Sequence, residues 1–199
     1  MSIENQKKIA NELLEKLEQI DPHCILAGGA PRDWYMGKEA NDLDFYVYGY
    51  GWSIGLILKR FKNIGIFGLV NLGEGPRPNT VYSSMKHLRC VYETTYKGQK
   101  IQIMIMNQPT FSSVVDYFGV TISQFWYKTG RIGMKREALL SIKYKVIGYK
   151  DDFSCKEAYF KKIQERFKNY RFTKMSGFKD VILSKVYLEA NNEATQTIS

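Results

Sequence analysis

The sequence predicts an α+β protein, with a small mixed β-sheet flanked by helices and a short helical C-terminal extension. Three observations indicate this class. Alternating apolar residues mark short strands before Lys135, amphipathic helices lie between them, and the pattern from Lys135 onward is helical. A chain of 199 residues can form one domain with a hydrophobic core and a small appendage. We place these at residues 1–150 and 151–199.

The first part of the chain is expected to alternate helices and strands. Apolar residues three and four apart mark an amphipathic first helix that ends before Pro22. Gly28-Gly29 breaks the next strand, and Pro31 suits the first turn of a helix because its missing N–H needs no partner there. Gly37 stops that short helix. The elements after the first helix are a strand, a short helix, a strand, a helix and a strand, over residues 23–27, 31–36, 42–48, 52–61 and 64–70.

A loop rich in Gly and Pro, residues 71–80, precedes two predicted hairpins. Their turns lie at Lys97-Gly98 and Thr129-Gly130. The hairpin strands cover residues 88–96, 100–106, 123–128 and 131–134. The helix between the hairpins covers residues 111–118, and the helical C-terminal region covers residues 135–192.

The net charge of +9 is concentrated in one segment. Residues 131–179 contain 14 Lys and Arg against 5 Asp and Glu, so they carry the whole excess. A local basic excess favours a polyanionic partner such as nucleic acid or nucleotide phosphates. A solvated helix face explains the same charge, and composition leaves both interpretations open.

The composition also excludes some classes of protein. At 44% hydrophobic and 14% aromatic residues the chain is globular rather than disordered. No apolar run approaches the roughly 20 residues that span a bilayer, and the polar N-terminus lacks the core of a signal peptide. Cys24, Cys90 and Cys155 are far apart, which argues against a disulfide framework or a zinc site. We therefore expect a cytoplasmic protein with no membrane partner.

Two aspartates separated by one residue form the first candidate site. Because side chains alternate between faces of a strand, Asp42 and Asp44 share one face while Leu43 and Phe45 enter the core. Close carboxylates repel each other unless a cation lies between them, and Mg²⁺ prefers carboxylate oxygens. The pair predicts a site for Mg²⁺ or Mn²⁺, although the same pattern also occurs on exposed strand faces.

A turn rich in glycine lies just upstream. Gly28 and Gly29, between a strand and a helix start, can present backbone N–H groups to an anion. Arg32 adds a bidentate phosphate donor, and Asp33 can hold Arg32 or cap a backbone group. Each feature alone has an ordinary explanation as a turn or a surface ion pair.

The combined spacing, Gly-Gly-x-x-Arg-Asp-x-x-x-Gly-x-x-x-x-Asp-x-Asp, resembles the nucleotidyltransferase head of class II CCA-adding enzymes and bacterial poly(A) polymerases. These belong to the DNA polymerase β-like superfamily. A fainter match is FGVTISQFWYKTGRI, residues 118–132, where Thr121 and Ile122 agree with a second family segment. The resemblance covers roughly residues 20–150 and is strong over 28–44. The matching positions of the first motif are Gly28, Gly29, Arg32, Asp33, Gly37, Asp42 and Asp44.

The resemblance implies a polymerase β-like nucleotidyltransferase domain at residues 1–150. Its activity would be metal-dependent, template-independent transfer of a nucleotidyl group from an NTP to an acceptor hydroxyl on RNA or tRNA, with a protein acceptor as the alternative. Asp42 and Asp44 would be catalytic and hold Mg²⁺ or Mn²⁺. The expected nucleotide- and phosphate-binding residues are Gly28, Gly29, Arg32 and Asp33. The candidate nucleic-acid-binding residues in the basic segment are Lys161, Lys162, Arg166, Lys168 and Arg171.

The chain departs from the family pattern at two positions. Gln102 lies on the strand face where many superfamily members carry a third carboxylate, and Gly119 replaces an aspartate of the second segment. Glu93 and Asp116 are candidate substitutes. These departures keep a second hypothesis open, a catalytically impaired protein that binds nucleotide or RNA. A third is a structural basic protein that binds nucleic acid or a protein partner through residues 131–179.

Overall fold

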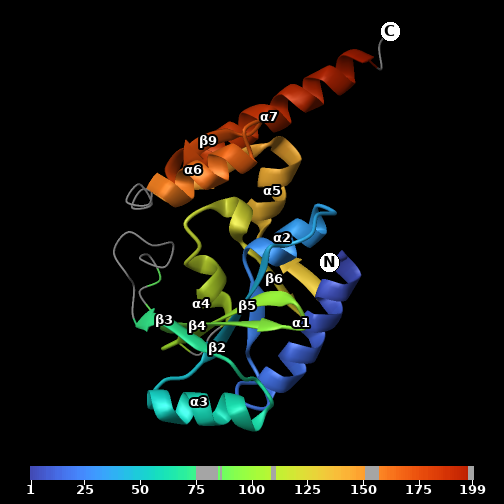
Figure 1. Cartoon of the computed structure of the whole chain (residues 1–199). Coiled ribbons are helices and arrows are strands. Elements are labelled where there is room, and N and C mark those ends of the chain that lie inside the picture. Colours follow the sequence, from blue (N-terminus) through green and yellow to red (C-terminus); the bar gives the residue numbers. More distant parts are fainter. Residues whose placement is uncertain (75–84, 86, 109–110, 151–156, 197–199) are drawn as a thin grey trace. The chain divides into compact units, whose positions relative to one another are not determined.

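The computed structural model describes residues 1–74, 85, 87–108, 111–150 and 157–196 (Figure 1). Part of the predicted loop at 71–80, and Cys155, lie outside the described residues. The chain divides into two compact units. The first comprises Met1–Phe118 with Ser123–Met134, and the second Gly119–Ile122 with Lys135–Ser199. The functional boundary expected at residue 150 stays a prediction.

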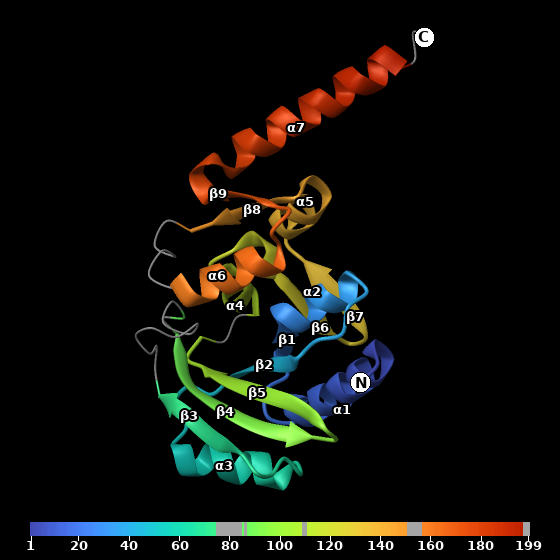
Figure 2. The same ribbon diagram turned by 45° about the horizontal axis from the view of Figure 1, so that its top comes forward.

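The first unit is built on a seven-stranded sheet in the order β3-β4-β5-β2-β1-β6-β7. Neighbouring strands are antiparallel except β2 and β5, which run parallel. Figure 2 shows β3, β4 and β5 side by side. The mixed sheet agrees with the predicted α+β class. The strands are β1 (Ile25–Ala27), β2 (Asp42–Tyr48), β3 (Val70–Glu74), β4 (Leu88–Tyr96), β5 (Gln99–Met106), β6 (Phe125–Lys128) and β7 (Arg131–Met134).

Helices cover both faces of this sheet. Ser2 and Ser53 cap α1 and α3, where each hydroxyl accepts a hydrogen bond from a backbone N–H three residues on. Apolar side chains of α1 and α3 pack on one face, which we call the α1 face, and those of α4 pack on the other, the α4 face. The helices are α1 (Ile3–Glu18), α2 (Gly29–Tyr35), α3 (Ile54–Asn63) and α4 (Phe111–Asp116). A 3₁₀ turn, η1 (Thr121–Ser123), belongs mostly to the second unit.

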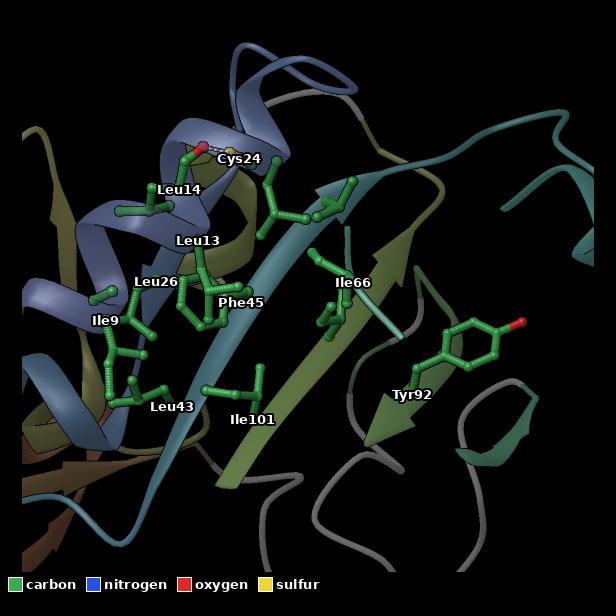
Figure 3. Close-up of a cluster of buried hydrophobic side chains, with 14 of the residues drawn as sticks. Ile9, Leu13, Leu14, Cys24, Leu26, Leu43, Phe45, Ile66, Tyr92 and Ile101 are labelled. Atoms are coloured by element: carbon green, nitrogen blue, oxygen red, sulfur yellow. Dashed lines mark hydrogen bonds between the residues drawn. The ribbon is translucent and has the colours of Figure 1, made fainter. Parts of the chain in front are cut away.

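The core under the α1 face fixes which way β2 turns its side chains. Leu43 and Phe45 are fully buried there beside Leu13 of α1 and Ile101 of β5 (Figure 3). Burying such a side chain contributes about 1.5–3 kcal/mol, so a one-residue slip of β2 is strongly disfavoured. Asp42 and Asp44, which alternate with these apolar residues, therefore lie on the α4 face.

Most strands of the first unit confirm the predictions, but one does not. The segment 64–70 was predicted as a strand, whereas β3 begins only at Val70 and extends into the predicted loop. Gly65 and Gly68 have φ angles of +74° and +67°, which a strand cannot contain. Ile66 is buried, so its apolar character reflects core packing rather than sheet pairing.

The second unit contains two strands that the helical prediction missed. β8 and β9 pair in parallel, with Val146 opposite Arg171, and this pairing corrects the expectation of helices throughout residues 135–192. Short strands separated by a helix gain their stability from each other, a contact that local periodicity does not reveal. The core holds Tyr144, Val146, Phe178 and Ile182. The elements are α5 (Arg136–Tyr144), β8 (Val146–Tyr149), α6 (Glu157–Arg166), β9 (Arg171–Lys174) and α7 (Met175–Gln196).

Two further features bear on the expected environment of the protein. In the described part of the chain, no helix combines the length and apolarity needed to cross a membrane. Cys24 is a buried thiol, and burial raises its pKa to about 12. Such a thiol is poorly reactive because little of it is thiolate.

Candidate active site

Asp42 and Asp44 lie half-buried on the α4 face of β2, as the alternation predicted. The Oδ1 atom of Asp44 is itself buried. Parallel pairing with β5 places Lys100 beside Asp42 and Gln102 beside Asp44. The sheet thus surrounds the two carboxylates with one cation and one neutral amide.

Glu93 extends this polar row by one strand. It pairs with Gln102 across β4 and β5, and the Gln102 Nε2 donates to Glu93 Oε2 at 2.8 Å. The Lys100 Nζ lies 2.8 Å from the same oxygen. The substitute carboxylate that the sequence indicated is therefore held by two neighbours, with β5 between it and Asp44. The other substitute, Asp116, is exposed at the end of α4.

The charges in this row are coupled. Lys100 and then Gln102 lower the pKa of the Glu93 carboxyl through hydrogen bonds. The hydrogen bond with Glu93 raises the pKa of Lys100, and the negative charges of Asp42 and Asp44 add to that rise. Three carboxylates face one ammonium, which leaves an excess of negative charge that a divalent cation can balance.

The sequence analysis did not identify Lys100 as a residue of the site, although the alternation along its strand indicated its position. The alternation that placed Gln102 on the polar face of its strand puts Lys100, two residues earlier, on the same face. Its contact with Glu93 depends on the pairing of β4 with β5, which the hairpin prediction contained.

The glycine turn lies next to the aspartate strand because β1 pairs with β2. Leu26 is opposite Phe45, so the antiparallel register brings Ala27 level with Asp44 and Gly28 just beyond it. Gly28 has φ +92° and ψ −122°, a conformation that L-residues rarely adopt. Its N–H donates to the Phe125 carbonyl at 2.9 Å, which engages that donor within the protein.

Phe118 packs over this turn. A Cβ on Gly28 would stand 3.5 Å from the ring of Phe118, and the same ring contacts Tyr46 edge-on, with centroids 6.0 Å apart. The Phe118 ring thus places apolar surface beside Gly28.

Arg32 and Asp33 form an internal ion pair. Asp33 Oδ1 accepts from Arg32 Nε at 2.9 Å and lies 2.8 Å from Arg32 Nη2, and each side chain is only 4% exposed. This confirms the expectation that Asp33 can hold Arg32. The guanidinium lies against Gly29, where a Cβ would stand 3.7 Å from Arg32 Nη2, an ordinary van der Waals distance. Contact of Arg32 with phosphate stays a prediction.

Gln6 of α1 fixes the chain just before Asp42. Its Nε2 donates to the Ala40 carbonyl at 2.6 Å and to Gln99 Oε1 at 2.9 Å. Its Oε1 accepts from the Ala40 N–H and from Trp34 Nε1, each at 2.9 Å. One buried amide therefore connects α1, α2, β5 and the residues that lead into the aspartate strand.

The predicted nucleic-acid-binding cations belong to the second unit. Lys161, Lys162 and Arg166 are exposed on α6, whose Ile163 is buried. Phe167, which directly follows α6, is also buried, so apolar residues of this stretch face inward while the cations face solvent. The two remaining cations, Lys168 and Arg171, are exposed as well, and Arg171 lies on β9 rather than on a helix.

The carboxylates fit an ion shared between protein and substrate. Among the residues that the structure describes, no group of three or more His, Cys, Asp or Glu side chains is arranged to hold a metal. Asp42 and Asp44 supply two carboxylates. Mg²⁺ in phosphoryl-transfer sites is bound by one or two carboxylates, waters and substrate phosphates, so two suffice.

Comparisons with known proteins identify the fold. A CCA-adding enzyme in complex with ATP has a TM-score of 0.58 and 17% identity over 94% of this chain and 43% of its own. The Thermotoga maritima CCA-adding enzyme complexed with tRNA gives 0.56 and 18% over 90% and 42%. A tRNA-processing enzyme in its apo form gives 0.57 and 19% over 93% and 48%.

These likenesses are structural. No family model matches the chain, and the search of curated proteins returned no match. The chain spans less than half the length of each of the three solved structures. The fold is the polymerase β-like nucleotidyltransferase fold, which confirms the fold that the sequence resemblance implied.

Proposed function

We propose that this chain, which has the fold of the CCA-adding enzyme head, transfers a nucleotidyl group from an NTP to an acceptor hydroxyl on RNA. The observation that carries the proposal is the register of β1, β2 and β5. It sets Asp42 and Asp44 side by side on one face, next to the turn at Gly28. RNA is the favoured acceptor because the relatives in fold are tRNA-processing enzymes and the second unit is basic.

Each residue of the site has a distinct part in this reaction. Asp42 and Asp44 would hold Mg²⁺ or Mn²⁺, an ion that would balance charge on the attacking and leaving oxygens. Gly28 makes the turn that lets a triphosphate approach the backbone, and Gly29 offers the N–H group. Arg32, oriented by Asp33, supplies positive charge for the phosphates. The acceptor hydroxyl attacks the α-phosphorus in line, and pyrophosphate leaves.

A second function is favoured by one observation. Gln102, beside Asp44, is a neutral amide with no negative charge to offer a metal or a proton. Glu93, the nearest replacement along the row, is already bound by Lys100 and Gln102. A protein that binds nucleotide or RNA without transferring it is therefore the alternative.

The deciding experiment tests each NTP against a mixture of possible acceptors. The full chain is incubated with each labelled NTP, with Mg²⁺ or Mn²⁺, and with a mixture of tRNA, other RNA and protein. We expect label on RNA, resolved on a denaturing gel, and none with the Asp42→Asn variant. NTP binding without transfer to any acceptor would establish the alternative, and label on protein alone would make protein the acceptor.

We expect Lys100→Met to tighten Mn²⁺ binding by the Asp42 and Asp44 pair. Removing the ammonium removes its electrostatic repulsion of the metal ion. A repulsion of roughly 1 kcal/mol corresponds to a dissociation constant that is about fivefold lower in the variant. Calorimetry without nucleotide measures it. Lys97→Met is the matched control, because Lys97 pairs with Glu12 at the tip of the same hairpin. Equal affinities in Lys100→Met and the parent would show that Lys100 does not influence the metal.

A further inference from the structure

A cationic pocket in the second unit includes one of the predicted nucleic-acid-binding residues, Arg171, and none of those on α6. It has a volume of about 480 Å³ and is lined by the end of α5, the start of β9 and the middle of α7. Four cations face one carboxylate, Glu189, within it. We call it the α5–α7 pocket. The lining residues are Lys143, Tyr144, Lys145, Asn169, Arg171, Lys185, Leu188 and Glu189.

Two of these cationic residues, Lys145 and Arg171, are joined through their backbones. Lys145 ends α5 in the left-handed conformation, with φ +52°. Its carbonyl accepts the N–H of Arg171 at 2.9 Å, next to the paired strands β8 and β9. Both side chains line the pocket, where like charges repel each other and a bound anion lowers that repulsion.

The positive charges of the pocket outnumber its negative charges. Lys143 lies 3.7 Å from Glu189 and its Nζ is 4.8 Å from the centre of the Tyr144 ring, so the one carboxylate of the pocket is already engaged. Lys185 of α7 is half-buried. Within the described residues, Lys145, Arg171 and Lys185 form no ion pair.

We propose that the α5–α7 pocket binds the phosphodiester backbone of the acceptor RNA. The proposal rests on the proposed function for the identity of the acceptor. An anion is indicated by the excess of cations from three separate elements, and planar Arg171 suits the two oxygens of a phosphate. A nucleic-acid backbone is favoured over a free nucleotide because Leu188 and the buried Tyr144 are the only apolar or aromatic residues of the lining, which leaves no exposed ring for a base to stack on.

The test compares RNA binding by a variant that lacks two charges of the pocket with binding by a variant that lacks two charges on α3. Lys145→Gln combined with Lys185→Gln should weaken binding of a fluorescent tRNA on the order of tenfold near 0.1 M salt. It should also flatten the plot of log affinity against log salt by roughly 0.7 for each phosphate that the variant no longer neutralises. Lys59→Gln with Lys62→Gln, exposed on α3, makes the same change in net charge and should alter neither quantity. Thermal melting of both variants verifies folding.

The outcomes distinguish an RNA backbone from a free nucleotide as the source of the bound phosphate. Binding of ATP with Mg²⁺, measured by calorimetry, should be unchanged in the pocket variant. Loss of ATP binding with tRNA binding retained would make the pocket a nucleotide site and overturn the proposal. Equal losses in the pocket and α3 variants would show that only overall charge matters, which also overturns it. Because binding is measured without turnover, a parent chain that binds tRNA through the pocket yet transfers nothing refutes only the proposed function.

Discussion

Asp42→Asn and Asp44→Asn are each expected to lower kcat/KM for nucleotidyl transfer by about a thousandfold or more. Each tenfold loss is 1.36 kcal/mol of transition-state stabilisation, and metal-ion catalysis supplies several kcal/mol. The two carboxylates share one strand face, so either substitution removes one of the two proposed ligands for the ion. Rates with labelled NTP and RNA, and Mn²⁺ binding by calorimetry, measure the effect.

The fold should survive both substitutions. The side chains of Asp42 and Asp44 are half-buried, and an amide fits the same volume. Without metal, neutralising one of two close carboxylates removes their repulsion, so the melting temperature should stay equal or rise. Asp180→Asn, on exposed α7, should change neither rate nor stability. Activity retained by either active-site variant would refute the metal role.

Asp33→Ala is expected to cost about 3 kcal/mol in the free energy of unfolding. Arg32 and Asp33 are both buried, and removing one member of such a pair leaves a buried charge without its counter-charge. Urea denaturation measures the loss. Asp180→Ala, an exposed aspartate, should stay within about 0.5 kcal/mol of the parent.

A double substitution tests the cause of that loss. In Arg32→Met with Asp33→Leu both charges disappear, and well-packed apolar pairs often equal or exceed the buried ion pair in stability. The double variant should therefore be more stable than Asp33→Ala. If Asp33→Ala is instead as mild as Asp180→Ala, other groups must neutralise Arg32. The same variants report on function, since loss of NTP binding in the stable double variant would support a phosphate contact by Arg32.

Local pattern was enough to predict the aspartate strand. β2 begins and ends where alternation predicted, because its apolar residues enter the core on one face only. The position of Gln102 beside Asp44 agrees with its predicted place on the polar face. The prediction works here because a period of two fixes the face of every side chain once one face is buried.

Other features depend on contacts that no local pattern contains. An arginine in the first turn of a helix is ordinarily exposed, and the burial of Arg32 follows from how α2 packs in the tertiary structure. β9 exists because β8 lies beside it, and its sequence Arg171 to Lys174 has too few apolar residues to predict a strand alone. The α5–α7 pocket depends on the same pairing, so the sequence showed its charge but not its shape.

The contacts of Gln6 have a consequence for how the protein folds during synthesis. They join residues 6, 34, 40 and 99, and the pairing of β2 with β5 also joins segments that are far apart in the sequence. At about 5–20 residues per second, the ribosome completes α1 and β2 several seconds before Gln99 emerges. In that interval Asp42 and Asp44 lack the strand that brings Lys100 beside them. Asp42 and Asp44 are therefore synthesised early, but their site reaches its final geometry late. This order is expected for a site built from contacts between residues that are distant in the sequence.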